Sequence, residues 1–137
     1  MTFIQNVSMA DIIKGNHHFV PGNTALIQIQ DFGCFQFAKP AKEFIQIGQF
    51  KFNDNDDPDS KMNITDQQAS DIADILFDCY SAKMNVIVHC HAGICRSGAV
   101  AEVGIIMGFE NLSVHRIPNV LVKTKLLKEL DFSNSWD

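Results

Sequence analysis

The feature that most constrains the fold of this chain is an apolar segment that ends in a cysteine and runs directly into a short polar turn. Residues 86–90 read Val-Ile-Val-His-Cys, a composition typical of a buried β-strand. A second apolar run, residues 99–107, stops at Gly108, which indicates a buried helix with a glycine stop. A strand, a tight loop and a helix N-terminus therefore meet at Cys90, and this arrangement favours binding of an anion.

The hydrophobic pattern elsewhere alternates between strand and helix. Residues 25–30 are predicted to form an inner strand, and residues 44–52 a further strand. Helical spacing of apolar residues predicts a helix over residues 66–82, which begins at a Thr-x-x-Gln capping box. This helix lies between the strands at 44–52 and 86–90, an order that predicts parallel pairing with a right-handed connection.

Two further segments complete the expected architecture. Residues 31–40 form a loop whose phenylalanines, Phe32, Phe35 and Phe37, are expected to be buried, with an aromatic wall beside a pocket as the alternative. Pro118 suits the first turn of a final helix that runs to about Leu130. We therefore expect an α/β fold with a central, mostly parallel twisted sheet flanked by helices, in which a phosphate-binding loop joins a central strand to a buried helix.

Size and charge restrict the function classes. The chain has 137 residues, 46% of them hydrophobic, which suits one domain over residues 1–137. A net charge of -5 argues against nucleic acid as a partner, because that binding needs a broad basic face. The sequence has no leader pattern and no apolar run of about 20 residues, so we expect a cytoplasmic protein that does not bind membranes.

The four cysteines are expected to be free thiols in a chain of this size and apolar content. They are Cys34, Cys79, Cys90 and Cys95.

The loop after Cys90 carries the pattern His-Cys-x-x-Gly-x-x-Arg-Ser. A loop this short must wrap back on itself, so its amides can form a nest for the oxygens of a phosphoryl group, while the planar fork of Arg96 binds two of them. The helix N-terminus and the nearby cation favour the thiolate form of Cys90, which can attack phosphorus. The expected phosphate-binding residues are His91, Ala92, Gly93, Ile94, Cys95 and Arg96.

The leaving group of such a reaction needs a proton, and Asp54 is the first candidate for the general acid. Asp54 lies just after the predicted strand 44–52, and the carboxyl ends of parallel strands share one edge of a sheet. Asp56 and Asp57 follow in the same acidic segment and are alternative candidates.

The sequence His-Cys-His-Ala-Gly-Ile-Cys-Arg-Ser at residues 89–97 resembles the signature of the cysteine-dependent protein tyrosine phosphatase superfamily. The short chain and its lone phosphatase loop are similar to the compact dual-specificity members, including small bacterial and phage enzymes. For a phage-encoded enzyme, the expected location would be the host cytoplasm. The Phe-x-Asp segment at 52–54 and the Pro-Asn pair at 118–119 are also similar. Departures are His91, Cys95 and the absence of the aromatic-Pro-Asp tripeptide of the receptor-like enzymes.

The resemblance implies a role for each matching residue. Cys90 would be the nucleophile of a phosphocysteine mechanism, Arg96 the phosphate clamp, and Asp54 the acid and then the base. Ser97 would hydrogen-bond the departing thiolate, and His89 would orient the backbone of the loop. The implied substrates are phosphorylated proteins or small phosphomonoesters, and neither a metal nor another cofactor is required.

Other functions remain open at this point. A phosphate-binding pseudophosphatase could hold a phosphorylated partner without turnover, because binding and catalysis are separable on one fold. Sulfur transfer or arsenate reduction could use the same loop, with Cys95 as a resolving thiol. A zinc site made of His89, Cys90, His91 and Cys95 is disfavoured, because neighbours on a strand point to opposite faces.

Overall fold

The chain alternates strands and helices around one sheet. The structure, a computed structural model, describes residues 2–55, 57, 59–113 and 115–130. Its elements in chain order are β1 (Phe3–Ser8), α1 (Met9–Lys14), β2 (Thr24–Gln30), β3 (Gln46–Lys51), α2 (Asp66–Ser81), β4 (Asn85–Cys90), α3 (Arg96–Met107), β5 (Glu110–Asn111) and α4 (Val120–Glu129).

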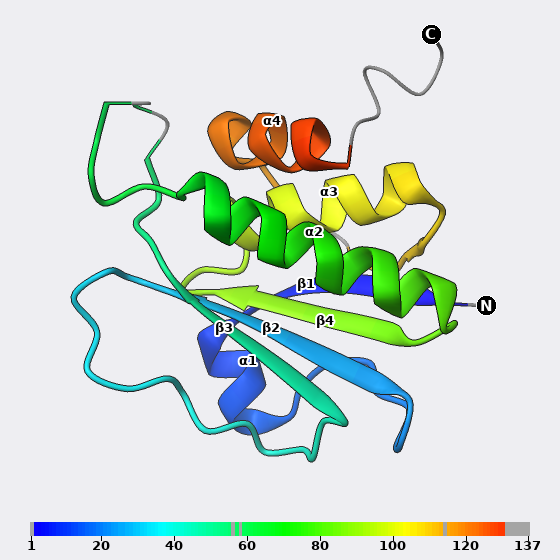
Figure 1. The fold of residues 1–137 in the computed structure, drawn as a ribbon. Helices are drawn as coiled ribbons and strands as arrows, with labels where there is room; N and C mark the ends of the chain where they lie inside the picture. Colours follow the sequence, from blue (N-terminus) through cyan, green and yellow to red (C-terminus); the bar gives the residue numbers. More distant parts are fainter. Residues whose placement is uncertain (1, 56, 58, 114, 131–137) are drawn as a thin grey trace, which may run out of the picture.

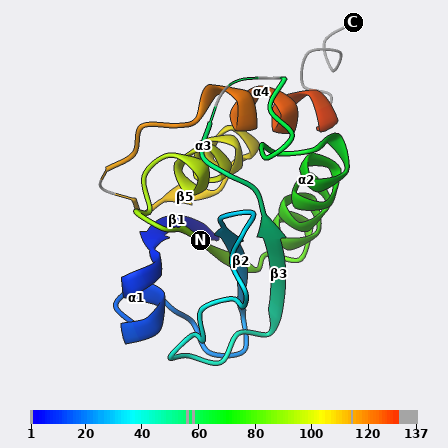
Figure 2. The same ribbon diagram turned by 90° about the vertical axis from the view of Figure 1, so that its left-hand side faces the viewer.

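The five strands pair in the order β3-β2-β4-β1-β5, and every pairing is parallel. The expected α/β class with a central parallel sheet is therefore confirmed, and β4 occupies the middle of the sheet. Because all strands run in one direction, their carboxyl ends gather at one edge, which faces the viewer in Figure 2.

One detail of the expected topology was wrong. The strand predicted at 44–52 was placed beside the strand at 86–90, but β2 lies between β3 and β4. The physical reason is burial: every residue of β2 is buried, so β2 needs neighbours on both sides. In contrast, β3 is largely exposed, with Ile47 44% exposed, and it forms an edge of the sheet.

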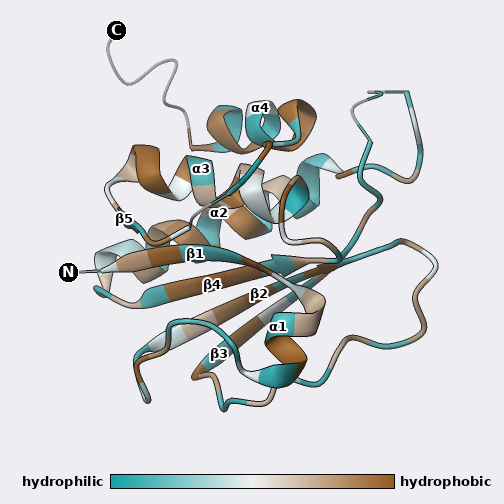
Figure 3. Ribbon diagram, turned by 180° about the vertical axis from the view of Figure 1, so that it is seen from behind, coloured by the Kyte–Doolittle hydropathy of each residue, from teal (hydrophilic) through white to brown (hydrophobic). Residues whose placement is uncertain are grey.

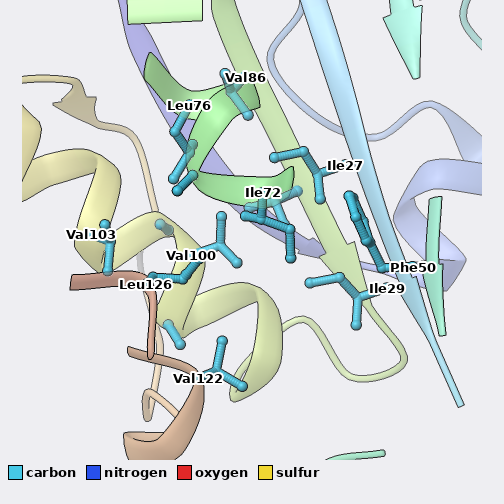
Figure 4. Close-up of a cluster of buried hydrophobic side chains, with 14 of the residues drawn as sticks. Ile27, Ile29, Phe50, Ile72, Leu76, Val86, Val100, Val103, Val122 and Leu126 are labelled. Carbon is cyan, nitrogen blue, oxygen red and sulfur yellow. The ribbon is translucent and has the colours of Figure 1, made fainter. Parts of the chain in front are cut away.

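Helices cover the two faces of the sheet unequally. α2, α3 and α4 lie over one face, and α1 lies on the other (Figure 1). The main core fills the space between the sheet and the three helices, and Figure 4 shows side chains from β2, β3, β4 and all three helices meeting there. Burial of each such aliphatic side chain contributes about 1.5–3 kcal/mol, so this face carries most of the stabilisation.

The inner strands are hydrophobic along most of their length (Figure 3). The smaller cluster on the opposite face consists of Phe3, Val7, Ile12, Leu26, Phe44 and Ile87. Toward the carboxyl end of β2, glutamines replace the apolar residues: Gln28 and Gln30 donate to the carbonyls of Ala38 and Gln36, at 2.8 and 3.1 Å. This end of the face therefore binds the 31–40 loop through polar groups.

That polar contact explains why the expectation for the loop phenylalanines was wrong. Phe35 is fully exposed and Phe32 is 54% exposed, while Phe37 is half-buried beside the Lys51 ammonium. The loop meets the sheet through its backbone, so Phe32 and Phe35 find no apolar surface to cover.

Helix ends follow the sequence signals at α2 but not at α4. Thr65 and Gln68 form the predicted capping box of α2. α4, however, begins after Pro118, because Asn119 is its N-cap and accepts a hydrogen bond from the amide of Val122. No helix in the described part of the chain is long and apolar enough to cross a membrane.

Candidate active site

The loop that joins β4 to α3 lies at the carboxyl edge of the sheet, as expected. Cys90, the last residue of β4, is only 2% exposed, and its Sγ lies 3.1 Å from the hydroxyl of Ser97. α3 begins at Arg96 and so includes Ser97 in its buried first turn. The fold therefore brings together the cysteine, the arginine and the serine of the signature.

Four carbonyl groups of this loop accept hydrogen bonds from groups outside it. The donors and acceptors are Met9 N to His91 O at 3.2 Å, Asn6 Nδ2 to Gly93 O at 2.7 Å, Ile117 N to Ile94 O at 3.2 Å, and Asn119 N to Cys95 O at 3.0 Å. By contrast, none of the amides of residues 92–98 finds a hydrogen-bond acceptor within the described part of the chain. Four of the carbonyl acceptors of the loop are therefore occupied, while its amide donors have no acceptor among the described residues, which suits an anion.

Gly93 allows the loop to lie against β1. It has φ +77, and a Cβ at this position would overlap the backbone of Val7 and Ser8. Asn6, on the same strand, donates to both Gly93 O and His115 O and is 7% exposed. Sequence reasoning missed Asn6, because its role depends on β1 lying next to β4.

Arg96 is fixed along one edge of its guanidinium and free along the other. Nη1 donates to Asp31 Oδ1 at 2.9 Å and to the carbonyl oxygen of Phe52 at 2.7 Å. Nε is buried and has no partner among the described residues, and Nη2 makes no hydrogen bond to them. Since Nε–H and Nη2–H form a parallel fork, the free edge has the geometry that binds two oxygens of a phosphate.

Asp31 is a site residue that sequence reasoning did not identify. Its side chain is 68% exposed and pairs with the Arg96 side chain, which is 5% exposed. The available signal was its place directly after the buried strand β2, the neighbour of β4.

His89 lies in the interior, with no exposed surface. Its Nδ1 is 3.4 Å from the carbonyl of Cys90, and its Nε2 has no partner among the described residues. The pKa of His89 is lowered to about 4, mainly by burial and also by the charge of Arg96, while the contact with the Cys90 carbonyl opposes this decrease. His89 is therefore neutral in the folded protein near pH 7.

Asp54 reaches the loop through Asn119. The Nδ2 of Asn119 donates to Asp54 Oδ1 at 2.8 Å. Burial raises the pKa of the Cys95 thiol, and the Asp54 carboxylate raises it further by its charge and by a hydrogen bond. The acidic segment therefore meets the loop after Cys90 at Cys95. A cavity of about 280 Å³ lies there and is lined by Asp54, Asn55, Cys95, Ile117, Pro118, Asn119 and Val120.

The other acid candidates differ in their surroundings. Asp57 is exposed, and both its side chain and its carbonyl accept hydrogen bonds from its own segment, from Asp59 and Asn63. Asp56 lies outside the described residues. Of the three aspartates, Asp54 therefore has a described link to the loop.

Among the described residues, the cysteine, histidine and acidic side chains form no metal centre. All four cysteines are free. Over residues 2–55, 57, 59–113 and 115–130, no three His, Cys, Asp or Glu side chains are grouped as metal ligands.

Substitution of Gly93 tests the close approach of the loop to β1. Gly93→Ala should destabilise the protein by several kcal/mol, because the new methyl group overlaps β1 in addition to the strain of a positive φ. Gly22→Ala is the matched control, since Gly22 has φ +74 but open space around it, and it should cost only about 1–2 kcal/mol. Urea denaturation measures both, and equal losses would contradict the close approach.

The pH dependence of stability tests the buried, neutral His89. Its pKa is lower in the folded protein, so the unfolded chain binds more protons between about pH 6.5 and 4. The free energy of unfolding should therefore fall as the pH decreases through this window, by up to about 3 kcal/mol. In His89→Asn that decrease should be smaller, while His17, whose pKa is also lowered by burial, contributes equally in both proteins. If the free energy of unfolding depends on pH in the same way in both proteins, His89 does not have a lowered pKa in the folded state.

Comparisons with known proteins bear on the fold. No protein-family model matches this sequence, and no curated protein sequence is similar to it. Among solved structures, the chain is similar to the crystal structure of human tyrosine phosphatase-like serine/threonine/tyrosine-interacting protein, with a TM-score of 0.62 and 18% identity. The match covers 93% of this chain and 91% of that chain. The protein therefore has a phosphatase-like α/β fold.

Proposed function

We propose that this protein is a phosphoric monoester hydrolase of the protein tyrosine or dual-specificity phosphatase type, which acts through a phosphocysteine on Cys90. The observation that carries the proposal is the free Nε–Nη2 edge of the buried Arg96, which lies on the same short loop as Cys90 and the unpaired amides. The phosphatase-like fold supports it. The substrates would be phosphorylated proteins or small phosphomonoesters.

In the first step, the thiolate of Cys90 attacks phosphorus in line while the bond from phosphorus to the ester oxygen breaks. Asp54 gives its proton to that oxygen, so the alcohol or phenol leaves neutral. Arg96 and the loop amides stabilise the charge on the equatorial oxygens of the transition state.

In the second step, water attacks the phosphocysteine and Asp54 takes a proton from it. The bond from sulfur to phosphorus breaks, and the electron pair returns to Cys90. Ser97, whose hydroxyl lies 3.1 Å from Cys90 Sγ, would stabilise the departing thiolate by a hydrogen bond.

A phosphate-binding module without turnover is the second candidate. The same loop would hold a phosphorylated partner, and one observation favours this candidate: Asp54 is exposed and lies in a segment without regular secondary structure. The two candidate functions therefore differ in whether Asp54 donates a proton to the leaving group.

Turnover by Cys90 can be measured directly. The purified protein should hydrolyse an aryl phosphate in the presence of a metal chelator, and Cys90→Ser should abolish this activity because an alcohol at this position is a poor nucleophile. Arg96→Lys keeps the charge but loses the fork, and it should weaken inorganic phosphate binding and turnover together. Turnover that requires a metal, or that survives Cys90→Ser, would contradict the mechanism, whereas phosphate binding without turnover would favour the second candidate.

The role of Asp54 can be separated from that of its neighbours. Asp54→Ala should slow hydrolysis of an alkyl phosphate by about 10²- to 10⁴-fold, since an alkoxide needs the proton. A phenol that is already acidic should leave with a smaller loss. Asp57→Ala is the matched control and should change either rate little; a large effect of Asp56→Ala instead would assign the acid to Asp56.

A further inference from the structure

Asn119 occupies a junction between the acidic segment, the phosphate loop and α4. It is 8% exposed. Its backbone amide donates to Cys95 O at 3.0 Å, and its Oδ1 accepts from Val122 N at 3.1 Å. Its Nδ2 donates to Asp54 Oδ1 at 2.8 Å and to Asn55 O at 3.0 Å.

We infer that Asn119 is a positioning residue that holds the Asp54 carboxylate against the phosphate loop, ready for proton transfer to the leaving group. This inference rests on the proposed function and adds a residue to it. Asn119 itself would touch neither the substrate nor Cys90, and it would act through Asp54.

The Asn119 side chain uses both its donors and its acceptor at this position. The amide group has two N–H donors, and both are used by the acidic segment; its oxygen is used to cap α4. Aspartate has the oxygen but no donor, and serine is too short to reach both acceptors. The backbone amide of Asn119 donates to the loop at Cys95 O. Asn119 therefore links the acidic segment, the loop after Cys90 and α4.

Asp54 has few other restraints. It is exposed, and Asn119 is the residue whose side chain hydrogen-bonds Asp54 Oδ1 at 2.8 Å. Oδ1 is held by Asn119, so the second carboxyl oxygen would carry the transferred proton. Asp54 and Cys95 line the same cavity, which places the carboxylate beside the loop.

Two substitutions separate positioning from helix capping. Asn119→Asp and Asn119→Ser both keep an oxygen that can cap α4, so thermal stability should stay close to that of the wild type. Both lose the donors to Asp54, and Asn119→Asp also adds a negative charge beside it. Thr124→Ala, at an exposed position of α4, is the control for unrelated effects on the helix.

The expected result is a loss that depends on the leaving group. Hydrolysis of an alkyl phosphate should fall about 10- to 100-fold in both Asn119 variants, within the contribution of a general acid, while an ester of a very acidic phenol should lose less. In an Asp54→Ala background, Asn119→Asp should cause no further loss, because the group that it positions is gone. Equal losses for both esters, or a further loss in that background, would overturn the inference.

Hydrogen exchange supplies a readout that does not need turnover. The segment around residues 53–55 should exchange faster in Asn119→Ser than in the wild type, and unchanged exchange would overturn the inference. The wild-type protein could hydrolyse no phosphate ester, while hydrogen exchange in the segment still increases in Asn119→Ser. That result would refute the proposed function but support the restraint of the segment by Asn119.

Discussion

The geometry of the candidate site depends on the hydrogen bonds that fix the backbone of the loop after Cys90. Hydrogen bonds from Met9, Asn6, Ile117 and Asn119 occupy carbonyl groups along it. Because these donors come from α1, β1 and the segment before α4, the loop keeps its shape only when elements on both faces of the sheet are in place. Its amides then find no acceptor among the described residues, an arrangement that is costly in a protein interior unless water or an anion meets them. The geometry that suits phosphate is therefore a consequence of the fold and not of the loop alone.

The parts of this site that the sequence predicted are those with local causes. Cys90, Arg96 and Ser97 lie on one loop and one helix turn, so their spacing alone brings them together. The capping box at Thr65 and Gln68 is likewise local. In contrast, the contacts of Asn6, Asp31 and Asn119 join segments that are far apart in the chain. Their roles depend on strand order and on where α4 begins, which periodicity does not encode.

The wrong prediction that the strand at 44–52 pairs with β4 also shows that local patterns do not determine strand order. Residues 44–52 and 86–90 are connected through a helix, and such a connection predicts parallel strands but does not say whether a third strand lies between them. The insertion of β2 between β3 and β4 has a direct effect on the site, because it places Asp31 beside Arg96. The predicted burial of Phe32 and Phe35 was wrong for a related reason. Their burial depends on the surface that the loop meets, and Gln28 and Gln30 make this surface polar.

The distribution of charge explains why these non-local contacts matter for binding. The chain carries a net charge of -5, so its overall field does not attract a phosphate dianion. Attraction must come from a few local groups, and the buried Arg96 is the principal one; yet one edge of its guanidinium already serves Asp31 and Phe52. That pairing fixes the plane of the guanidinium and orients its free edge, while the nearby Asp31 carboxylate offsets part of its positive field. The free amides of residues 92–98 and the N-terminus of α3 supply the remaining compensation without adding a charged residue. The arrangement of these donors therefore suits a tetrahedral oxyanion of phosphate size.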